Sequence, residues 1–494
     1  MKLKDLLDND YAGADADICG ITADSRKVKP GYLFVALPGL VFNGADFIED
    51  AIKAGATAIL AIPQVKTDDD SVMWILDEYP GRIFPHIVSR FFSSQPENIA
   101  AVTGTNGKTS VAFFTQQIWK QLGIKAASVG TLGIQSDDYQ KDTGLTTPDP
   151  VVIHKALSEL CDQGVNHVVF EASSHGLDQR RLDGLNISAA AFTNLTHDHL
   201  DYHKTEAEYF NAKKRLFSEV LSPSKTAVLN VDSPLVREVQ KICEAKGHKI
   251  ITVGSDDGDI RLLNQRTSSS GQEITVTYEG KIYDISLPLV GQFQATNALM
   301  AVGLVIGCGG DADKAFKALA YLRPVRGRME QAGRHPAGAR IYVDYAHTPD
   351  ALETVLRALR PHVKGSLSVV FGCGGDRDKT KRQVMGKVAY ELADRVYVTD
   401  DNPRSERPND IRNEILKGCP TGYDAGERSV AIERAVRELG VGDILLVAGK
   451  GHEQGQTIGD DVIDFDDVSV VRSAIATLEQ SDQKIETKNI RKAQ

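Results

Sequence analysis

The chain of 494 residues carries 57 Lys plus Arg against 67 Asp plus Glu, a formal net charge of −10, which argues against binding nucleic acid or anionic membranes through overall charge. Its length suits about two to four domains that each bury a core of their own. Its six cysteines form no C-x-x-C pair, the N-terminus lacks a signal-type apolar core, and the run LMAVGLVIGCGG is too short to span a bilayer, so we expect a cytoplasmic protein with reduced thiols.

The first block, residues 1–97, mixes short strands with a helix. GYLFVALPG and ATAILAI are typical of strands, and ADFIEDAIKAG between them is typical of an amphipathic helix. The block ends at SSQPEN, a polar joint that contains proline. We expect one small domain over these residues.

The second block, residues 98–325, opens with the apolar strand NIAAVTG, the glycine-rich motif GTNGKT and a predicted helix over 108–122. The standard loop G-x-x-x-x-G-K-[ST] would need a glycine where Val102 stands, so this is a shorter variant. Backbone N–H groups and the positive dipole end of the helix would still attract an anion. Lys108, expected to face solvent at the helix start, would add a charge, and Thr109 a hydroxyl for Mg²⁺. Phosphate binding is therefore favoured over an ordinary strand–turn–helix corner.

The remainder of this block alternates short apolar strands with helical segments. VNHVVFEASS, ISAAAFTNLT and KTAVLNVD are the strand candidates, and this alternation predicts a parallel sheet with helices on both faces. EITVTYEGKIYDISLPLVG alternates polar and apolar residues, which predicts a small antiparallel insertion.

The segment FTNLTHDHLDYH concentrates histidines and aspartates after a strand. The H-x-H-x-D-H signature of dinuclear zinc hydrolases would require histidine where Tyr202 stands. The alternative is a Mg²⁺ site in which one histidine, Glu171 and a phosphate oxygen supply the ligands, because Mg²⁺ prefers oxygen and keeps several waters. Both interpretations stay open from the residues, and a solvated capping loop is less favoured.

The helical segment EAEYFNAKKRLFSEVL contains two lysines that periodicity does not separate. Lys213 lies four residues after Tyr209 and four before Phe217, while Lys214 lies between Phe210 and Phe217. The pattern alone favours side chains that extend along the apolar surface with their ammonium groups in water.

The third block, residues 326–494, has the strand candidates ARIYVDYA, SLSVVFGCGG, RVYVTDD and DILLVAGKG, each followed by a predicted helix. This pattern predicts a second doubly wound α/β domain, in which ligands bind beyond the carboxyl ends of the strands. Arg377 stands where a G-x-G-x-x-G turn needs its last glycine, which favours carboxylate binding. In AGKGHE we expect Lys450, His452 and Glu453 to be exposed.

Seven motifs in this order, GTNGKT, EASSHGL, HDHLDYH, YAHTPDAL, GCGGDRDKTKR, DDNPRSE and AGKGHE, resemble the Mur ligases of peptidoglycan synthesis. The resemblance covers nearly the whole chain and includes ADSRKVKPGYLFVALPG near the start. It implies an α/β protein with a UDP-substrate-binding domain, a central P-loop ATPase domain and a C-terminal Rossmann-like domain that binds an amino acid. The short loop would then hold ATP, whose γ-phosphate activates a carboxylate.

The implied reaction joins meso-diaminopimelate to UDP-N-acetylmuramoyl-L-alanyl-D-glutamate through an acyl phosphate, with Mg²⁺ as cofactor and ADP and phosphate as products. An L-lysine-adding homologue, a zinc hydrolase and a nucleotide-binding protein without catalysis remain the alternatives. We expect a monomer whose partners are these small molecules.

The resemblance also implies roles by position. ATP would contact Gly104, Thr105, Asn106, Gly107, Lys108, Thr109, Ser110, Asn297, Arg328, Asp344 and His347. The muramyl dipeptide would contact Ser25, Thr146, Thr147, Ser173, Gln179 and Arg181, and diaminopimelate would contact Arg377, Asp401, Asn402, Pro403, Arg404, Gly449 and Glu453. Lys108, Lys213 and His199 would be catalytic, and Mg²⁺ would be held by Thr109, Glu171, His199 and Lys213, the last as N6-carboxylysine.

Overall fold

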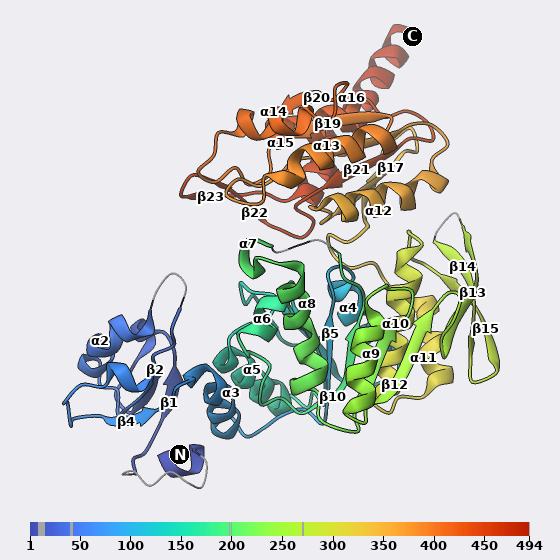
Figure 1. Ribbon diagram of the computed structural model, residues 1–494. Coiled ribbons are helices and arrows are strands. Elements are labelled where there is room, and N and C mark those ends of the chain that lie inside the picture. Colours follow the sequence, from blue (N-terminus) through green and yellow to red (C-terminus); the bar gives the residue numbers. More distant parts are fainter. Residues whose placement is uncertain (8–14, 40–42, 197, 199, 269–270, 494) are drawn as a thin grey trace.

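The computed structural model describes residues 1–7, 15–39, 43–196, 198, 200–268 and 271–493 (Figure 1). The described residues form three sheets of four, eleven and six strands and a separate two-stranded hairpin. The three sheets follow one another along the chain, and the third lies above the second in the view of Figure 1. The α/β class with parallel sheets that the sequence predicts is confirmed.

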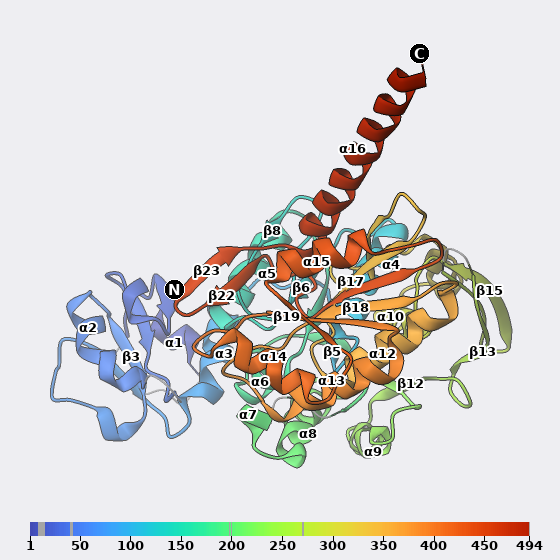
Figure 2. The ribbon, with the colours of Figure 1, turned by 90° about the horizontal axis from the view of Figure 1, so that it is seen from above.

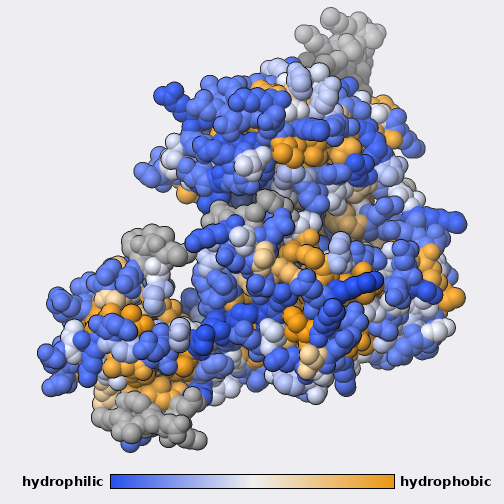
Figure 3. Space-filling view, viewed as in Figure 1, coloured by the Kyte–Doolittle hydropathy of each residue, from blue (hydrophilic) through white to orange (hydrophobic). Residues whose placement is uncertain are grey.

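The first sheet is parallel, and its strands lie in chain order. Its elements are α1 (Leu3–Leu6), β1 (Gly20–Thr22), η1 (Ser25–Lys27), β2 (Tyr32–Val35), η2 (Gly44–Phe47), α2 (Ile48–Lys53), β3 (Ala58–Ala61), η3 (Pro63–Val65), β4 (Met73–Leu76) and α3 (Pro80–Phe91). Successive side chains of a strand point to opposite faces, so Leu33 packs with Phe84 on one face while Phe34 packs with Ile48 on the other. In Figure 3 apolar residues gather on the visible face of this body, whereas most of the remaining visible surface is hydrophilic.

The second sheet has the strand order β15-β14-β13-β12-β11-β10-β5-β9-β6-β7-β8. Its strands are β5 (Asn98–Thr103), β6 (Ala126–Gly130), β7 (Gly133–Gln135), β8 (Gln140–Lys141), β9 (His167–Glu171), β10 (Ile187–Phe192), β11 (Thr226–Asn230), β12 (Lys249–Gly254), β13 (Ile260–Thr267), β14 (Gln272–Tyr278) and β15 (Lys281–Leu287). The strands from β12 to β6 pair in parallel. The predicted antiparallel pairing of β14 with β15 is present, but β13 joins this hairpin to the same sheet.

Helices cover both faces of this sheet. They are α4 (Lys108–Gln121), α5 (Pro150–Asp162), α6 (Ser174–Asp178), α7 (Leu200–His203), α8 (Glu206–Arg215), the π-helix η4 (Leu216–Val220), α9 (Val236–Ala245), α10 (Phe293–Gly307), α11 (Ala312–Ala318) and η5 (Leu319–Tyr321). Side chains of α4, α10 and α11 pack on one face, and those of α5, α8 and α9 pack on the other. Strand β5 is buried on both faces, so its carboxyl end carries the phosphate-type loop at the centre of a rigid sheet.

The third sheet has the order β16-β17-β21-β18-β19-β20, and only its edge strand β16 pairs antiparallel. Its elements are β16 (Glu330–Arg334), β17 (Arg340–Asp344), α12 (Pro349–Leu359), η6 (Arg360–His362), β18 (Leu367–Phe371), α13 (Thr380–Leu392), β19 (Arg395–Thr399), α14 (Pro408–Leu416), β20 (Tyr423–Gly426), α15 (Arg428–Arg437), β21 (Ile444–Ala448), β22 (Gly455–Ile458), β23 (Asp461–Asp464) and α16 (Asp467–Ala493). Helices α12, α13 and α14 cover one face, and α15 and α16 cover the other.

Three of the four strands expected in this block are followed by the predicted helix, but β21 is not. The hairpin β22–β23 intervenes before α16 begins. Figure 2 shows the far end of α16 extending away from the body of the molecule. Within the described part of the chain, no helix combines the length and the apolar composition needed to cross a bilayer.

A buried ion pair fastens α16 to the third sheet. Arg428 donates two hydrogen bonds to Asp467 at 2.7 Å and a third to the carbonyl of Ala448 at 2.9 Å, and both charged side chains are fully buried. Removing one partner of such a pair leaves an uncompensated buried charge. The pair therefore ties the start of α16 to the carboxyl end of β21.

Asp467→Ala is expected to lower the free energy of unfolding by about 3–5 kcal/mol, because Arg428 would stay buried without its carboxylate. Urea titration followed by circular dichroism measures this change. Glu353→Ala removes an exposed pair with Arg357 and should cost less than about 1 kcal/mol. Equal effects of the two substitutions would contradict a structural role for the buried pair.

Candidate active site

A cavity of about 280 Å³ lies where the second sheet meets the third. Fourteen of the residues implied by the family resemblance line it: Thr105, Asn106, Gly107, Lys108, Thr109, Ser110, Thr146, Glu171, Ser173, Lys213, Asn297, Arg328, Asp344 and His347. Two hydrogen bonds join the sheets across it, from Arg328 to Thr109 (3.2 Å) and from Asn106 to Asp350 (2.9 Å). The loop of the second sheet is thus brought against Arg328, which precedes β16, and Asp350, which follows β17.

The loop adopts the tight turn that its glycines predict. Gly107 has a φ of +87°, in the left-handed region that favours glycine, immediately before α4 begins at Lys108. A Cβ on Gly107 would stand 2.5 Å from Oδ1 of Asn297, so the glycine also permits close packing against α10.

Lys108 does not face solvent as we expected. Its Nζ turns back over the loop and donates to the carbonyls of Gly104 (2.9 Å) and Thr105 (2.7 Å). Burial lowers the pKa of Lys108, and the carboxylates of Glu171 and Asp198 oppose that shift. The ammonium is therefore held over the carbonyls of the glycine-rich turn.

Glu171, at the carboxyl end of β9, accepts three hydrogen bonds. The hydroxyl of Thr109 donates at 2.9 Å, and Thr131 donates from its hydroxyl at 3.1 Å and from its backbone N–H at 2.8 Å. A Cβ on Gly130 would stand 2.0 Å from the Glu171 carboxylate, so this strand end must carry glycine. Sequence reasoning missed Thr131, although its place after β6 at the carboxyl edge of the sheet was a usable signal.

Lys213 is one of the most deeply buried charged side chains, with 1% of its surface exposed. Its Nζ donates to the carbonyl of Gly104 at 2.7 Å and lies 4.4 Å from the centre of the Tyr209 ring. Burial and the nearby Lys108 cation hold the pKa of Lys213 well below its ordinary value. Lys214 instead points outward to Glu238, so the expectation that either lysine reaches water holds for Lys214 and is wrong for Lys213.

The histidine–aspartate cluster is described only in part. His199 lies outside the described residues, while Asp198 lines the cavity. Among the described residues, no three His, Cys, Asp or Glu side chains are grouped as metal ligands. Thr109 and Glu171 nevertheless present hydroxyl and carboxylate oxygens side by side, which are ligands that suit Mg²⁺.

The opposite wall of the cavity comes from the start of the third sheet. Asp344 accepts from the backbone N–H groups of Met329 (2.7 Å) and Ala346 (2.8 Å), and burial raises its pKa. The guanidinium of Arg328 stacks 4.2 Å from the centre of the Tyr345 ring. Burial lowers the pKa of His347. Tyr345 was not anticipated, because its contact Arg328 lies before β16 whereas Tyr345 follows β17.

A second cavity of about 840 Å³ adjoins the first, and Asp198, Tyr345 and His347 line both. Six of the seven residues expected to hold diaminopimelate line it: Arg377, Asp401, Asn402, Arg404, Gly449 and Glu453. Pro403 is not among the described residues that line this cavity. Burial and the neighbouring Asp401 raise the pKa of Glu453. Cationic and anionic groups thus line the same cavity, a combination that suits a zwitterion.

Lys450 corrects another expectation, because it is fully buried rather than exposed. Its Nζ donates to Oδ1 of Asn402 (2.8 Å) and to the carbonyl of Gly455 (2.7 Å). His452 and Glu453 are only partly exposed, and burial lowers the pKa of His452 to about 3. The AGKGHE turn is therefore a packed support for the second cavity.

The residues expected to bind the muramyl dipeptide lie in two places, at or near the first cavity and beside the first sheet. Thr146 and Ser173 line the first cavity, and Thr147 shares a hydrogen bond of 2.9 Å with Ser173. Arg181 donates to the Thr147 carbonyl and to Gln179, both at 2.6 Å. Ser25 lies on η1 beside the first sheet and lines neither cavity.

A glycine-rich loop at a helix start, beside a second cavity lined by cationic and anionic groups, is an arrangement that suits an ATP-dependent ligase. Three family models match the chain: Mur ligase family, catalytic domain, at residues 17–106; Mur ligase middle domain at 102–305; and Mur ligase, glutamate ligase domain, at 327–451. The chain belongs to the Mur ligase family of ATP-dependent amide ligases. This membership decides against the zinc hydrolase.

Relatives extend this finding over nearly the full length. The UDP-N-acetylmuramoyl-L-alanyl-D-glutamate–2,6-diaminopimelate ligase of Zymomonas mobilis is 49% identical over 465 residues, which cover 93% of this chain and 95% of the relative. The enzyme of the same name from Bradyrhizobium diazoefficiens is 48% identical, with 97% and 99% covered. A solved structure of a ligase of this name is 32% identical with a TM-score of 0.68, covering 94% of this chain and 95% of that one. The MurF ligase of Thermotoga maritima in complex with ADP, 19% identical with a TM-score of 0.64, is similar in fold.

Proposed function

We propose that the chain uses ATP to join meso-diaminopimelate to the D-glutamate carboxylate of UDP-N-acetylmuramoyl-L-alanyl-D-glutamate. The observation that carries this proposal is the wall of Asp198, Tyr345 and His347, which the two cavities share. A carboxylate phosphorylated in the first cavity would face an amine bound in the second. Activation is necessary because a carboxylate in water acylates amines poorly. Relatives of this name at 48–49% identity support the choice of substrates.

The residues of the first cavity support phosphoryl transfer by position and charge. The N-terminal N–H groups of α4 and the Lys108 ammonium would hold the phosphates, with Arg328 facing them from the third sheet. Asn297, Asp344 and His347 would flank the nucleotide. These groups are held before the substrate arrives, so they would stabilise charge that develops in the transition state without reorganising.

Mg²⁺ fits the oxygen donors of this cavity. Thr109 and Glu171, with His199, would hold it, and a carbamate on Lys213 would supply a further carboxylate-type oxygen. The ion would neutralise charge on the phosphate oxygens. The carbamate forms when the neutral Nζ attacks CO₂ and loses a proton, and the buried position of Lys213 favours the neutral amine that this step requires.

The remaining assignments complete the proposal. Thr146, Thr147, Ser173, Gln179 and Arg181 would bind the peptide part of the muramyl substrate, and Ser25 would bind near its uridine nucleotide. We take residues 1–97, 98–325 and 326–494 as the three domains, and a cytoplasmic monomer as the working form. Asp401 and Glu453 would face the ammonium groups of diaminopimelate, and Arg377 and Arg404 its carboxylates.

Amino-acid selection tests this function. Diaminopimelate carries a carboxylate at the end where L-lysine has only an ammonium, and Arg404 would hold that carboxylate through charge-assisted hydrogen bonds. Lysine would leave the guanidinium without its partner and place a cation against it, at a cost of about 2–5 kcal/mol. The wild type should therefore prefer diaminopimelate by about two orders of magnitude or more in kcat/KM, measured as phosphate release with ATP, Mg²⁺ and the uridine-linked dipeptide.

Arg404→Ala should raise the KM for diaminopimelate sharply and relieve part of the penalty on lysine. Arg357→Ala, on the exposed side of α12, provides the matched loss of a guanidinium and should leave both values near wild type. A wild type that used lysine as well as diaminopimelate would favour the lysine-adding alternative and end the assignment of Arg404 as the selector.

A further inference from the structure

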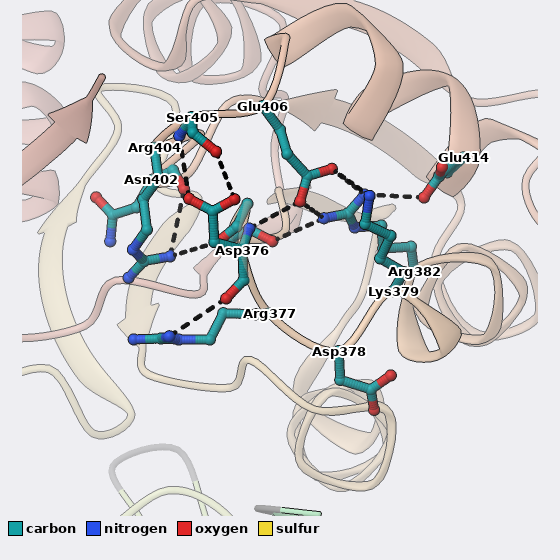
Figure 4. A network of polar contacts seen from close by, with 12 residues as sticks. Asp376, Arg377, Asp378, Lys379, Arg382, Asn402, Arg404, Ser405, Glu406 and Glu414 are labelled. Atoms are coloured by element: carbon teal, nitrogen blue, oxygen red, sulfur yellow. Dashed lines mark hydrogen bonds and ion pairs between the residues drawn. The ribbon is translucent and has the colours of Figure 1, made fainter. Parts of the chain in front are cut away.

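Two loops of the third sheet meet beside the second cavity, one after β18 and one after β19 (Figure 4). Their backbones approach so closely that a Cβ on Gly375 would stand 1.9 Å from the carbonyl oxygen of Pro403. Nη1 of Arg404 donates to the carbonyl of Gly375 at 2.8 Å, and a Cβ on Gly374 would stand 2.9 Å from the same nitrogen. The Arg404 side chain, which lines the second cavity, is therefore held in place by the loop after β18.

Each loop contains one residue in the left-handed backbone region. Asp376 has a φ of +54° and Arg404 has a φ of +51°, a conformation that side chains with a Cβ rarely adopt unless surrounding contacts impose it. The Asp376 carboxylate accepts from the backbone N–H of Ser405 at 3.1 Å and from its hydroxyl at 2.6 Å. The turn at Asp376 thus holds Ser405, the residue that follows the turn at Arg404.

Glu406 and Arg382 complete this connection from inside the protein. Arg382 on α13, with 1% of its side chain exposed, donates to both oxygens of Glu406 at 3.0 and 2.9 Å and to the carbonyl of Gly374 at 3.2 Å. Glu406 in turn accepts from the backbone N–H of Asp376 at 2.7 Å. Two parallel charge-assisted bonds fix both position and angle.

We call Asp376, Arg382, Ser405 and Glu406 the loop latch. None of its four members is among the described residues that line either cavity, yet its bonds hold the Asp376 and Ser405 backbones and the Gly374 carbonyl, beside Gly375 and Arg404. Nη1 of Arg404 donates to the carbonyl of Gly375, while Nε and Nη2 make no hydrogen bond within the described residues. We call Nε and Nη2 the free edge of Arg404. The direction in which this free edge points depends on where the latch places Gly375.

We propose that the loop latch consists of positioning residues that set amino-acid selectivity by aiming the free edge of Arg404 at the distal carboxylate of the incoming amino acid. The inference rests on the proposed function. It adds that selectivity depends on the four residues of the loop latch, which line neither cavity, as well as on Arg404 itself.

Glu406→Gln is the principal test, because it keeps the size and an acceptor oxygen but removes the charge that binds Arg382. The KM for diaminopimelate should rise about tenfold or more, since a misplacement of about 1 Å is enough to lose that much. The diaminopimelate-to-lysine ratio of kcat/KM should fall by a similar factor. The kcat at saturating diaminopimelate and the KM for ATP should stay near wild type.

Two further comparisons separate positioning from general stability. Glu414→Gln removes the other carboxylate on Arg382. Within the described part of the chain Glu414 makes no hydrogen bond or ion pair with the 402–406 loop, so this variant should leave selectivity unchanged. Asp376→Gly preserves the left-handed backbone without strain and removes the carboxylate, so it should reduce selectivity. Asp376→Asn, which tolerates the same backbone and keeps an acceptor, should restore much of it.

The outcomes distinguish the two proposals. A wild type that does not use diaminopimelate overturns the proposed function and this inference with it. A selective wild type with an unchanged Glu406→Gln variant overturns the inference alone. A variant whose kcat, both KM values and melting temperature all deteriorate together has lost general structure, and that result also overturns the positioning role.

Discussion

Lys108→Ala is expected to reduce kcat by about 10²-fold or more while the protein stays folded. The substitution removes the ammonium that the loop holds over its own carbonyls, at 2.9 and 2.7 Å from Gly104 and Thr105. In the proposed reaction that charge stabilises the phosphoryl group during transfer. Steady-state release of phosphate with all three substrates measures the loss.

Lys120→Ala is the matched control, because this lysine lies near the other end of the same helix and pairs with Asp137 at the surface. It should retain nearly full activity. A folded Lys108→Ala protein with turnover close to wild type would show that the loop does not carry the transferred phosphate.

Lys213→Ala is expected to lower activity by about 10- to 100-fold or more, because it removes the proposed carbamate from the Mg²⁺ site. Formate or acetate in the buffer should restore part of the activity by occupying the vacated anionic position. Depleting bicarbonate and CO₂ should lower wild-type activity, because the carbamate requires CO₂. Turnover with and without each addition measures all three effects.

Lys214→Ala tests the same change one residue further along the helix, where the side chain binds Glu238 at the surface. It should be close to wild type and insensitive to added carboxylates. An active Lys213→Ala protein, or an unmodified Lys213 in a crystal structure with nucleotide and Mg²⁺ bound, would refute the carbamate.

The strongly apolar strands were predictable because they are buried on both faces. NIAAVTG contains β5, and strands β9, β10 and β11 of the same sheet lie where VNHVVFEASS, ISAAAFTNLT and KTAVLNVD predicted them. Strands such as β1 and β8, with three and two residues, carry too little periodicity to be seen. Their pairing depends on partners brought near by the fold, which a local pattern does not contain.

The site was predictable where its geometry is local. The glycines of GTNGKT specify the turn by themselves, whereas the choice between Lys213 and Lys214 did not follow from a period of 3.6. The helix changes to the π-helix η4 at Leu216, which shifts the register of the apolar face on which that choice depended. Lys450 was misjudged because its partner Asn402 is 48 positions away along the chain, so a glycine-rich turn seemed exposed.

The wall shared by the two cavities also bears on inhibitor chemistry. On the proposed function, one compound would carry a phosphate-like group for the loop and an amino-acid group for the second cavity. A linker that runs past Tyr345 and His347, which line both cavities, would connect the two groups. Once one end is bound, a short linker keeps the other at an effective concentration in the millimolar range, so two weak groups would combine into a tight ligand without any new contact. The linker has to match the width of that wall, since one that is too short binds through one end alone.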